Sequence, residues 1–140
     1  MISPSLLKSV KTHEGRDMRA YKDSVGVWTI GYGTNLQELE IDEELATRWL
    51  HDRLKAAARE AGGFPWFKDL DIPRQDVVVE MIYNLGLVRF AKFGKMHAAI
   101  LAQDYGLAAT EMRNSTWAGQ VGHRAERLAA QMRTGDYWNE

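Results

Sequence analysis

Three residues that can carry out acid–base chemistry lie close together near the N-terminus. Glu14 stands directly before a glycine, and Asp23 and Thr29 follow within the stretch HEGRDMRAYKDSVGVWTIGYGTN. Cleavage of a glycosidic bond requires two carboxyl groups in unlike environments, one to protonate the leaving oxygen and one to activate water or attack the sugar. The spacing therefore predicts glycosidase-like chemistry, with Glu14 as general acid, Asp23 as the ionised carboxylate and Thr29 holding a water.

Each of these residues also has an ordinary structural interpretation. A glutamate before a helix-ending glycine is usually solvated, and an aspartate that opens a turn usually stabilises the turn itself. Threonine is common in strands because its branched side chain packs well on a pleated surface. The prediction therefore depends on the order and spacing of the three residues together.

The elements predicted around these residues fold the two carboxylates toward each other. Ser3 and Pro4 are suited to begin a helix that ends at Glu14. We expect Glu14 on the apolar side of this helix and partly buried, and both burial and the helix dipole favour a protonated carboxyl there. Residues 18–34 read as a β-hairpin with a turn at 23–26 and room for a third short strand.

The rest of the chain is predicted to be helical. One long helix begins at Asp42 and ends before Gly62, and a second, apolar and buried, follows Pro73. Three more helices are expected at about 90–103, 105–113 and 122–134. The predicted fold is α+β and mainly α, with a small hairpin lobe and a larger helical lobe joined by the long helix. Core or satellite packing is expected for the tryptophans, which are Trp28, Trp49, Trp66, Trp117 and Trp138.

Composition narrows the possible functions. The chain has 140 residues, enough for one domain, and a net charge of −1 with no basic arm, which argues against nucleic-acid binding. It has no cysteine, so neither disulfides nor thiolate chemistry are available. No run approaches the ~18 apolar residues of a membrane span, and none at the N-terminus has the length of a signal peptide. The four histidines lack metal-ligand spacing, so we expect no metal and no cofactor.

The N-terminal stretch closely resembles the motif of phage-type lysozymes, the endolysin muramidases of glycoside hydrolase family 24. Their pattern is E-G, a spacer, D, a short turn with glycine, then T-x-G-x-G. The segment DVVVEMIYNLG is similar to the family's buried helix, and STWAGQVGHRAERLAAQMRTG to its C-terminal S-x-W-x-x-Q-x-x-x-R-A segment. The resemblance assigns Glu14 as the general acid, Asp23 as the second carboxylate and Thr29 as the water-positioning hydroxyl.

The resemblance also implies a lysozyme-like lobe arrangement and a set of cleft residues. The small lobe with the linking helix would cover about residues 14–60, and the helical lobe about 61–140 together with 1–13. Arg124 matches a family arginine near the acid and is expected to orient Glu14. Thr34 stands where many members have histidine. Substrate-binding roles are expected for Tyr32, Thr34, Asn84, Gln120 and Arg124.

The activity implied by the resemblance is hydrolysis of the β-1,4 bond between N-acetylmuramic acid and N-acetylglucosamine in bacterial peptidoglycan, with inversion. The resemblance further implies a monomer without stable membrane association that waits in the host cytoplasm. Such an enzyme reaches the periplasmic cell wall by holin-dependent export and degrades it for host lysis. Many members are basic, whereas this chain is slightly acidic. Affinity for the wall is therefore expected to come from the cleft more than from long-range charge.

Two other functions remain open at this point. A lytic transglycosylase works with a single catalytic glutamate and leaves anhydro-muramic acid ends, which would make Asp23 and Thr29 bystanders. A non-catalytic peptidoglycan- or chitin-binding module would bind the polymer and release no reducing ends. The presence of all three motif residues argues against the second alternative.

Overall fold

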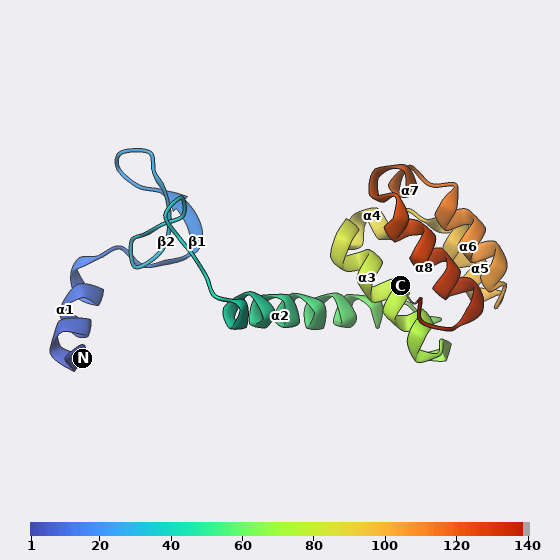
Figure 1. Ribbon diagram of the computed structural model, residues 1–140, viewed down its shortest axis with the longest axis horizontal. Helices are drawn as coiled ribbons and strands as arrows, with labels where there is room; N and C mark the ends of the chain where they lie inside the picture. Colours follow the sequence, from blue (N-terminus) through green and yellow to red (C-terminus); the bar gives the residue numbers. More distant parts are fainter. Residues whose placement is uncertain (139–140) are drawn as a thin grey trace. The chain divides into compact units, whose positions relative to one another are not determined.

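The computed structural model describes residues 1–138 of the chain. It contains two compact units, which we call unit 1 (Met1–Ala46) and unit 2 (from Thr47 onward). The predicted α+β, mainly helical class is confirmed, since helices dominate and a three-stranded antiparallel sheet accompanies them (Figure 1). The expected grouping of residues 1–13 with the helical lobe concerns the placement of the units relative to each other and stays a prediction.

Unit 1 consists of one helix and the small sheet. Ser3 begins the helix as predicted, because its Oγ accepts a hydrogen bond from the Leu6 amide at 3.1 Å. The predicted hairpin and third strand are both present, in the order β1-β2-β3, so β2 is the central strand. The elements of unit 1 are α1 (Pro4–His13), β1 (Asp17–Lys22), β2 (Trp28–Gly31) and β3 (Thr34–Asn35).

Very little of unit 1 is buried. Thr29 is the one residue of the unit that is withdrawn from solvent, at 4% exposure. The apolar side chains of α1 are exposed, with Leu7 at 52% and Val10 at 43%. α1 therefore has the predicted apolar side, but no other part of unit 1 packs against these apolar side chains.

The long helix α2 (Glu43–Ala61) is confirmed, and it begins at Asp42, whose Oδ1 accepts the Leu45 amide proton at 2.8 Å. Beyond it, the predicted helix at about 90–103 is two helices, because the chain leaves helical geometry at Phe93, where ψ is 55°. A further short helix was not predicted; Ser115 caps it, and Gly122 with φ of 58° ends it. The elements of unit 2 after α2 are η1 (Phe67–Asp69), α3 (Ile72–Leu85), α4 (Leu87–Ala91), α5 (Gly94–Leu101), α6 (Tyr105–Arg113), α7 (Thr116–Val121) and α8 (His123–Thr134).

The hydrophobic core lies in unit 2 and is centred on α3, as the apolar pattern predicts. Val77, Val78 and Met81 of α3 are completely buried and pack with apolar residues of α5, α6 and α8. Burial of these apolar side chains removes a large apolar area from water. It therefore supplies most of the stabilising free energy of the unit.

The tryptophan prediction is correct for Trp66 and Trp117 and wrong for Trp28 and Trp49, whereas Trp138 makes a satellite contact, with Arg127 Cζ 4.5 Å from the centre of its ring. Trp66 and Trp117 are buried, at 8% and 2% exposure. Trp28 and Trp49 are about half exposed, at 50% and 47%, and Trp138 is 36% exposed. Trp49 stays outside the core because α2 contributes only residues near its C-terminal end, Ala57 and Ala61, to the buried set.

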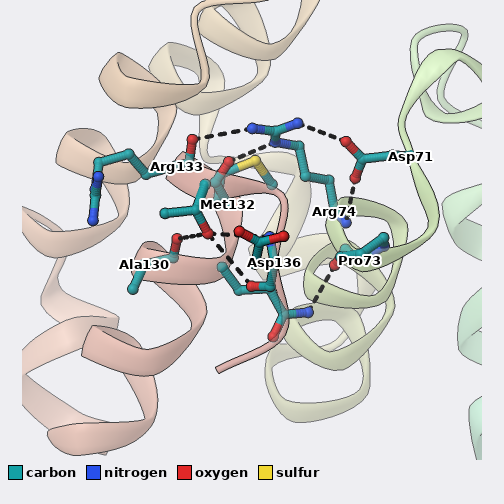
Figure 2. Close-up of polar contacts among 9 residues, drawn as sticks. Asp71, Pro73, Arg74, Ala130, Met132, Arg133 and Asp136 are labelled. Atoms are coloured by element: carbon teal, nitrogen blue, oxygen red, sulfur yellow. Dashed lines mark hydrogen bonds and ion pairs between the residues drawn. The ribbon is translucent and has the colours of Figure 1, made fainter. Parts of the chain in front are cut away.

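A polar junction fastens the start of α3 to the end of α8 (Figure 2). Arg74 donates from Nε to the Met132 carbonyl at 2.7 Å and from Nη2 to the Arg133 carbonyl at 3.0 Å. Asp71, which caps α3, accepts from Nη1 of the same arginine at 2.6 Å. Gln131 is 3% exposed and donates to the Pro73 carbonyl at 2.7 Å. The two bonds from Arg74 to Met132 and Arg133 satisfy carbonyl groups at the C-terminal end of α8 that have no partner within the helix.

Candidate active site

Glu14 lies where α1 gives way to the sheet. It is the C-terminal cap of α1, with extended backbone angles, and its amide donates to the Val10 carbonyl at 2.9 Å. Its carboxyl group lies against Gly33, since a Cβ placed on that glycine would be 3.1 Å from Glu14 Oε2. Within unit 1 the residue is exposed, so the partial burial expected from the sequence is not found there.

Asp23 opens the turn between β1 and β2, as predicted, and its side chain holds that turn together. Oδ1 accepts the amide protons of Val25 and Val27 at 2.9 and 2.8 Å. The Asp23 amide in turn donates to the Val27 carbonyl at 2.9 Å. These bonds fix the carboxylate and leave Oδ2 without a partner among the residues that the structure describes.

Thr29 lies on the central strand and is buried at 4% exposure. It pairs with Tyr21 on β1 and with Asn35 on β3. Its hydroxyl donates to the Val27 carbonyl at 2.9 Å. The hydroxyl proton is therefore already used in this bond, whereas the hydroxyl oxygen can still accept hydrogen bonds through its lone pairs. Val27 therefore connects the two candidate residues, with its amide on Asp23 and its carbonyl on Thr29.

The glycines of the T-x-G-x-G motif make the turn that faces Glu14. Gly31 and Gly33 have φ values of +69° and +87°, which residues with a side chain rarely adopt. At Gly33 a side chain would also meet the Glu14 carboxyl group. The two glycines thus allow the β2–β3 turn to approach the candidate acid, as a strand glycine near a functional group often does.

Two of the predicted substrate-binding residues belong to the same turn. Tyr32 is half-buried, and Lys11 Nζ lies 5.4 Å from the centre of its ring. Thr34 is exposed and pairs with Ile30 across β2 and β3. Unit 1 therefore brings together the catalytic candidates and these two polar side chains around one small sheet.

The other predicted substrate-binding residues lie in unit 2, and each is held by a partner that sequence reasoning missed. Asn84 Oδ1 accepts from Trp117 Nε1 at 2.7 Å, so the indole fixes the amide. Arg89 donates from Nη2 to Gln120 Oε1 at 3.2 Å. Arg124 donates from Nε to Glu80 Oε2 at 2.9 Å. Contact of these residues with a substrate stays a prediction.

Unit 2 also has a cationic cavity that the sequence analysis did not identify. It has a volume of about 640 Å³, and Phe93 and Trp117 contribute aromatic rings to its wall. Its cationic wall residues are Arg89, Lys92 and Lys95, against the single carboxylate of Glu111. The signal was present in the segment RFAKFGK, where basic residues recur every third position. Such a cavity can accept an anionic group beside an apolar one.

Among residues 1–138, no group of three or more His, Cys, Asp or Glu side chains is arranged to hold a metal ion. No helix in that part of the chain combines the length and the apolar character needed to cross a bilayer.

Comparison with known proteins decides the family. The family model described as phage lysozyme matches residues 11–133, a range that includes Glu14, Asp23 and Thr29. This chain belongs to the phage lysozyme family. Curated relatives of this phage lysozyme include probable T4-type lysozymes 1 and 2 of Dictyostelium discoideum, which are 26% and 24% identical to it. Each alignment covers 94% of this chain and 95% of the relative. Family membership makes the protein a lysozyme-type glycosidase, a cell-wall hydrolase of the muramidase class.

Proposed function

We propose that this phage lysozyme hydrolyses the β-1,4 bond between N-acetylmuramic acid and N-acetylglucosamine in bacterial peptidoglycan. The observation that carries the proposal is the arrangement around Val27, which ties a fixed carboxylate, Asp23, to a buried hydroxyl, Thr29. Glu14 supplies the second carboxyl group, beside the Gly33 backbone. Two carboxyl groups and a hydroxyl in this arrangement match the requirements of glycoside hydrolysis.

Each residue has a distinct part in the proposed reaction. Glu14 gives its proton to the leaving glycosidic oxygen. Asp23 accepts a proton from the attacking water at Oδ2, because Oδ1 already accepts two amide protons. Thr29 accepts a hydrogen bond from the same water, since its own proton goes to the Val27 carbonyl. The glycosidic bond breaks as the water oxygen bonds to the anomeric carbon.

We further propose that the reaction inverts the anomeric centre. An attacking water needs room between the sugar and its base, which corresponds to carboxyl groups roughly 6.5–9.5 Å apart, against ~5–5.5 Å for direct attack by a carboxylate. A hydroxyl that holds water beside Asp23 would have no use if Asp23 attacked the sugar itself. Proton NMR of fresh digests, read before mutarotation, is expected to show α-anomeric reducing ends. Early β-anomer would make Asp23 a nucleophile.

Substrate-binding roles are proposed for polar residues of each unit. Tyr32 and Thr34 would bind sugars beside the catalytic residues of unit 1, and Asn84, Gln120 and Arg124 of unit 2 are proposed to contact the glycan as well. The cavity with three cations suits the carboxylates that the peptides of peptidoglycan carry. Because the chain has a net charge of −1, this local charge would matter more than overall attraction to the wall.

Mass spectrometry of digested peptidoglycan, together with reducing-end assays, tests the function. The wild type is expected to release ordinary reducing ends, and Glu14→Gln to lose activity by ~10²–10⁴-fold, the usual contribution of a general acid. Asp23→Asn and Thr29→Ala should lower kcat more than they raise KM, because they act on the transition state. Anhydro-muramic acid ends would indicate a lytic transglycosylase, and binding without any release would indicate a binding module.

We propose an endolysin role for the enzyme, as a monomer that waits in a host cytoplasm and reaches the periplasmic wall by holin-dependent export. The family description supports this role, whereas the curated relatives come from an amoeba. Expression in bacteria with and without a holin gene distinguishes holin-dependent export from another route to the wall. Lysis that requires the holin supports the endolysin role, and lysis without it would show another route to the wall.

A further inference from the structure

One face of α3 carries three polar residues, each four positions from the next: Asp76, Glu80 and Asn84. Residues four apart lie above one another on a helix, so the three form a row. Each bonds a side chain from the C-terminal part of the chain, and the three partners are Tyr137, Arg124 and Trp117. The row is unusual because α3 is otherwise the buried apolar helix of unit 2.

The middle partner, Arg124, occupies an electrostatically poor position. It is the second residue of α8, at the end of the helix where the dipole is positive and cations are disfavoured. The carboxylate of Glu80 offsets this, since Arg124 Nε lies 2.9 Å from Glu80 Oε2. Both side chains are partly exposed, at 37% and 40%, so screening by water makes their ion pair a weak source of stability. The ion pair therefore contributes more to the direction of the Arg124 side chain than to the stability of the fold.

The ion pair orients Arg124 through its Nε–H alone and leaves the N–H groups of the two terminal nitrogens available for other hydrogen bonds. Glu80 accepts the Nε–H of Arg124, and the two terminal nitrogens of Arg124 have no partner among residues 1–138. A planar guanidinium held at Nε has a fixed direction for its terminal N–H groups, which form the edge suited to a carboxyl group. Glu80 thus fixes the direction in which Arg124 presents four donors.

We propose that Glu80 is a positioning residue of the hydrolytic reaction, which acts by orienting Arg124 through its Nε. The inference rests on the proposed function, in which Arg124 is one of the polar groups at the substrate. Without Glu80, the arginine would lose its fixed direction while keeping its charge. The rate would then fall although the fold persists, because misplacement of a contributing group lowers the rate more than the stability.

A double-mutant cycle in kcat/KM, measured as reducing-end release from soluble peptidoglycan fragments, tests the proposal. Glu80→Met keeps about the length of the side chain and removes the oxygen that accepts the Nε–H, and it should lower kcat/KM roughly tenfold or more. In an Arg124→Lys background the same change should have no further effect. Glu126→Met is the matched control, because Glu126 forms an equivalent pair on α8, from Oε2 to Arg113 Nε at 3.2 Å. It should leave kcat/KM unchanged.

A charge swap separates positioning from structural support. The double variant Glu80→Arg with Arg124→Glu can restore an ion pair and the melting temperature, but it moves the guanidinium to α3, so activity should stay low. The proposal is overturned if Glu80→Met behaves like Glu126→Met, if its effect persists with Arg124→Lys, or if the swap restores the rate. A wild type that releases no reducing ends would overturn the proposed function and this inference together, whereas an active wild type with an unaffected Glu80→Met variant overturns the inference alone.

Discussion

At the scale of single residues, the candidate site depends on the close approach of the β2–β3 turn backbone to the Glu14 side chain. Gly33 is the clearest case, because its φ of +87° would strain any residue with a side chain and an added Cβ would lie 3.1 Å from Glu14 Oε2. The motif T-x-G-x-G therefore has a physical basis beyond turn formation. The glycine sets the distance at which the sheet approaches the candidate acid.

Gly33→Ala is expected to impair catalysis beyond its effect on stability. The added Cβ would lie 3.1 Å from Glu14 Oε2, so the carboxyl group must move, and a displaced acid costs roughly tenfold or more in kcat. Gly26→Ala is the matched control, since Gly26 has a φ of +84° but no atom within 4 Å of an added Cβ. Both variants should lose about 1–2 kcal/mol of stability from backbone strain. Equal kcat values for the two would show that Gly33 does not set the position of Glu14.

His97 is a titratable residue in the aromatic part of the unit 2 core. Phe90, Phe64 and Trp66 surround its ring at centroid distances of 4.7, 5.0 and 5.4 Å. Its Nε2 is buried and has no partner among the residues that the structure describes. Burial lowers the pKa of His97 below its ordinary value, and a hydrogen bond with the Phe90 backbone opposes this to a smaller extent.

This lowered pKa predicts that the protein loses stability in mild acid. The unfolded chain binds a proton to His97 as the pH falls through about 6.5, whereas the folded chain does so only at a lower pH. Stability is therefore fully present above the unfolded pKa and is lost as the pH falls toward the folded one. Urea unfolding at a series of pH values should show a steeper loss in the wild type than in His97→Gln. His123→Gln, at an exposed histidine, should retain the wild-type slope, and equal slopes for all three proteins would contradict the argument.

At the scale of elements, unit 2 depends on how α3 is joined to α8. The apolar face of α3 packs in the core, and polar bonds at both of its ends fix its direction. At the N-terminal end Arg74 reaches two carbonyl groups of α8 (Figure 2). Near the C-terminal end Asn84 accepts from Trp117 of α7. Polar bonds of this kind contribute less free energy than apolar burial, but they select one arrangement of the helices.

Arg74→Lys should destabilise unit 2 by about 1.5–3 kcal/mol, the usual contribution of hydrogen bonds to a charged group. Lysine keeps the charge but cannot reach Asp71, Met132 and Arg133 together, because it lacks the planar fork of the guanidinium. Arg113→Lys changes an arginine whose ion pair is largely exposed and should cost little. Chemical denaturation of both variants measures the difference. A similar loss for the two would mean that the junction contributes nothing specific.

At the scale of the whole molecule, the two units differ greatly in how much they bury. All the buried hydrophobic residues that the structure describes lie between Ala57 and Met132, in unit 2, whereas in unit 1 only Thr29 is buried. The residues proposed to catalyse the reaction thus belong to the unit with the smaller core. Functional segments with few buried contacts are typically the ones that open most easily.

Hydrogen exchange of the intact protein should reflect this asymmetry. Amides of α3 and α8 are expected to exchange slowest, at rates set by global unfolding, because these helices contain completely buried residues such as Val77 and Met132. Amides of β1, β2 and β3 should exchange much faster, through local opening of unit 1. Saturating substrate fragments should slow exchange in the sheet more than in α3. Equal protection of both units in the free protein would contradict this division.

The sequence by itself determined the parts that depend on local patterns. It located the caps Ser3 and Asp42, the turn at Asp23 and the strands on either side, because capping and turn chemistry act over a few residues. The resemblance of its motifs to those of phage-type lysozymes also indicated the family, and the match over residues 11–133 confirmed it. The roles of Glu14, Asp23 and Thr29 stay predictions, although the side chains of Asp23 and Thr29 both bond to the backbone of Val27.

Tertiary structure decided what depends on contacts between distant residues. Periodicity did not separate α4 from α5, and composition did not show that Trp28 and Trp49 stay exposed while Trp117 is buried. Neither the pairing of Glu80 with Arg124, 44 residues apart, nor the cationic cavity has a local signal strong enough to predict its partners. Such features arise because packing chooses which side of each helix meets another, and that choice depends on the whole chain at once.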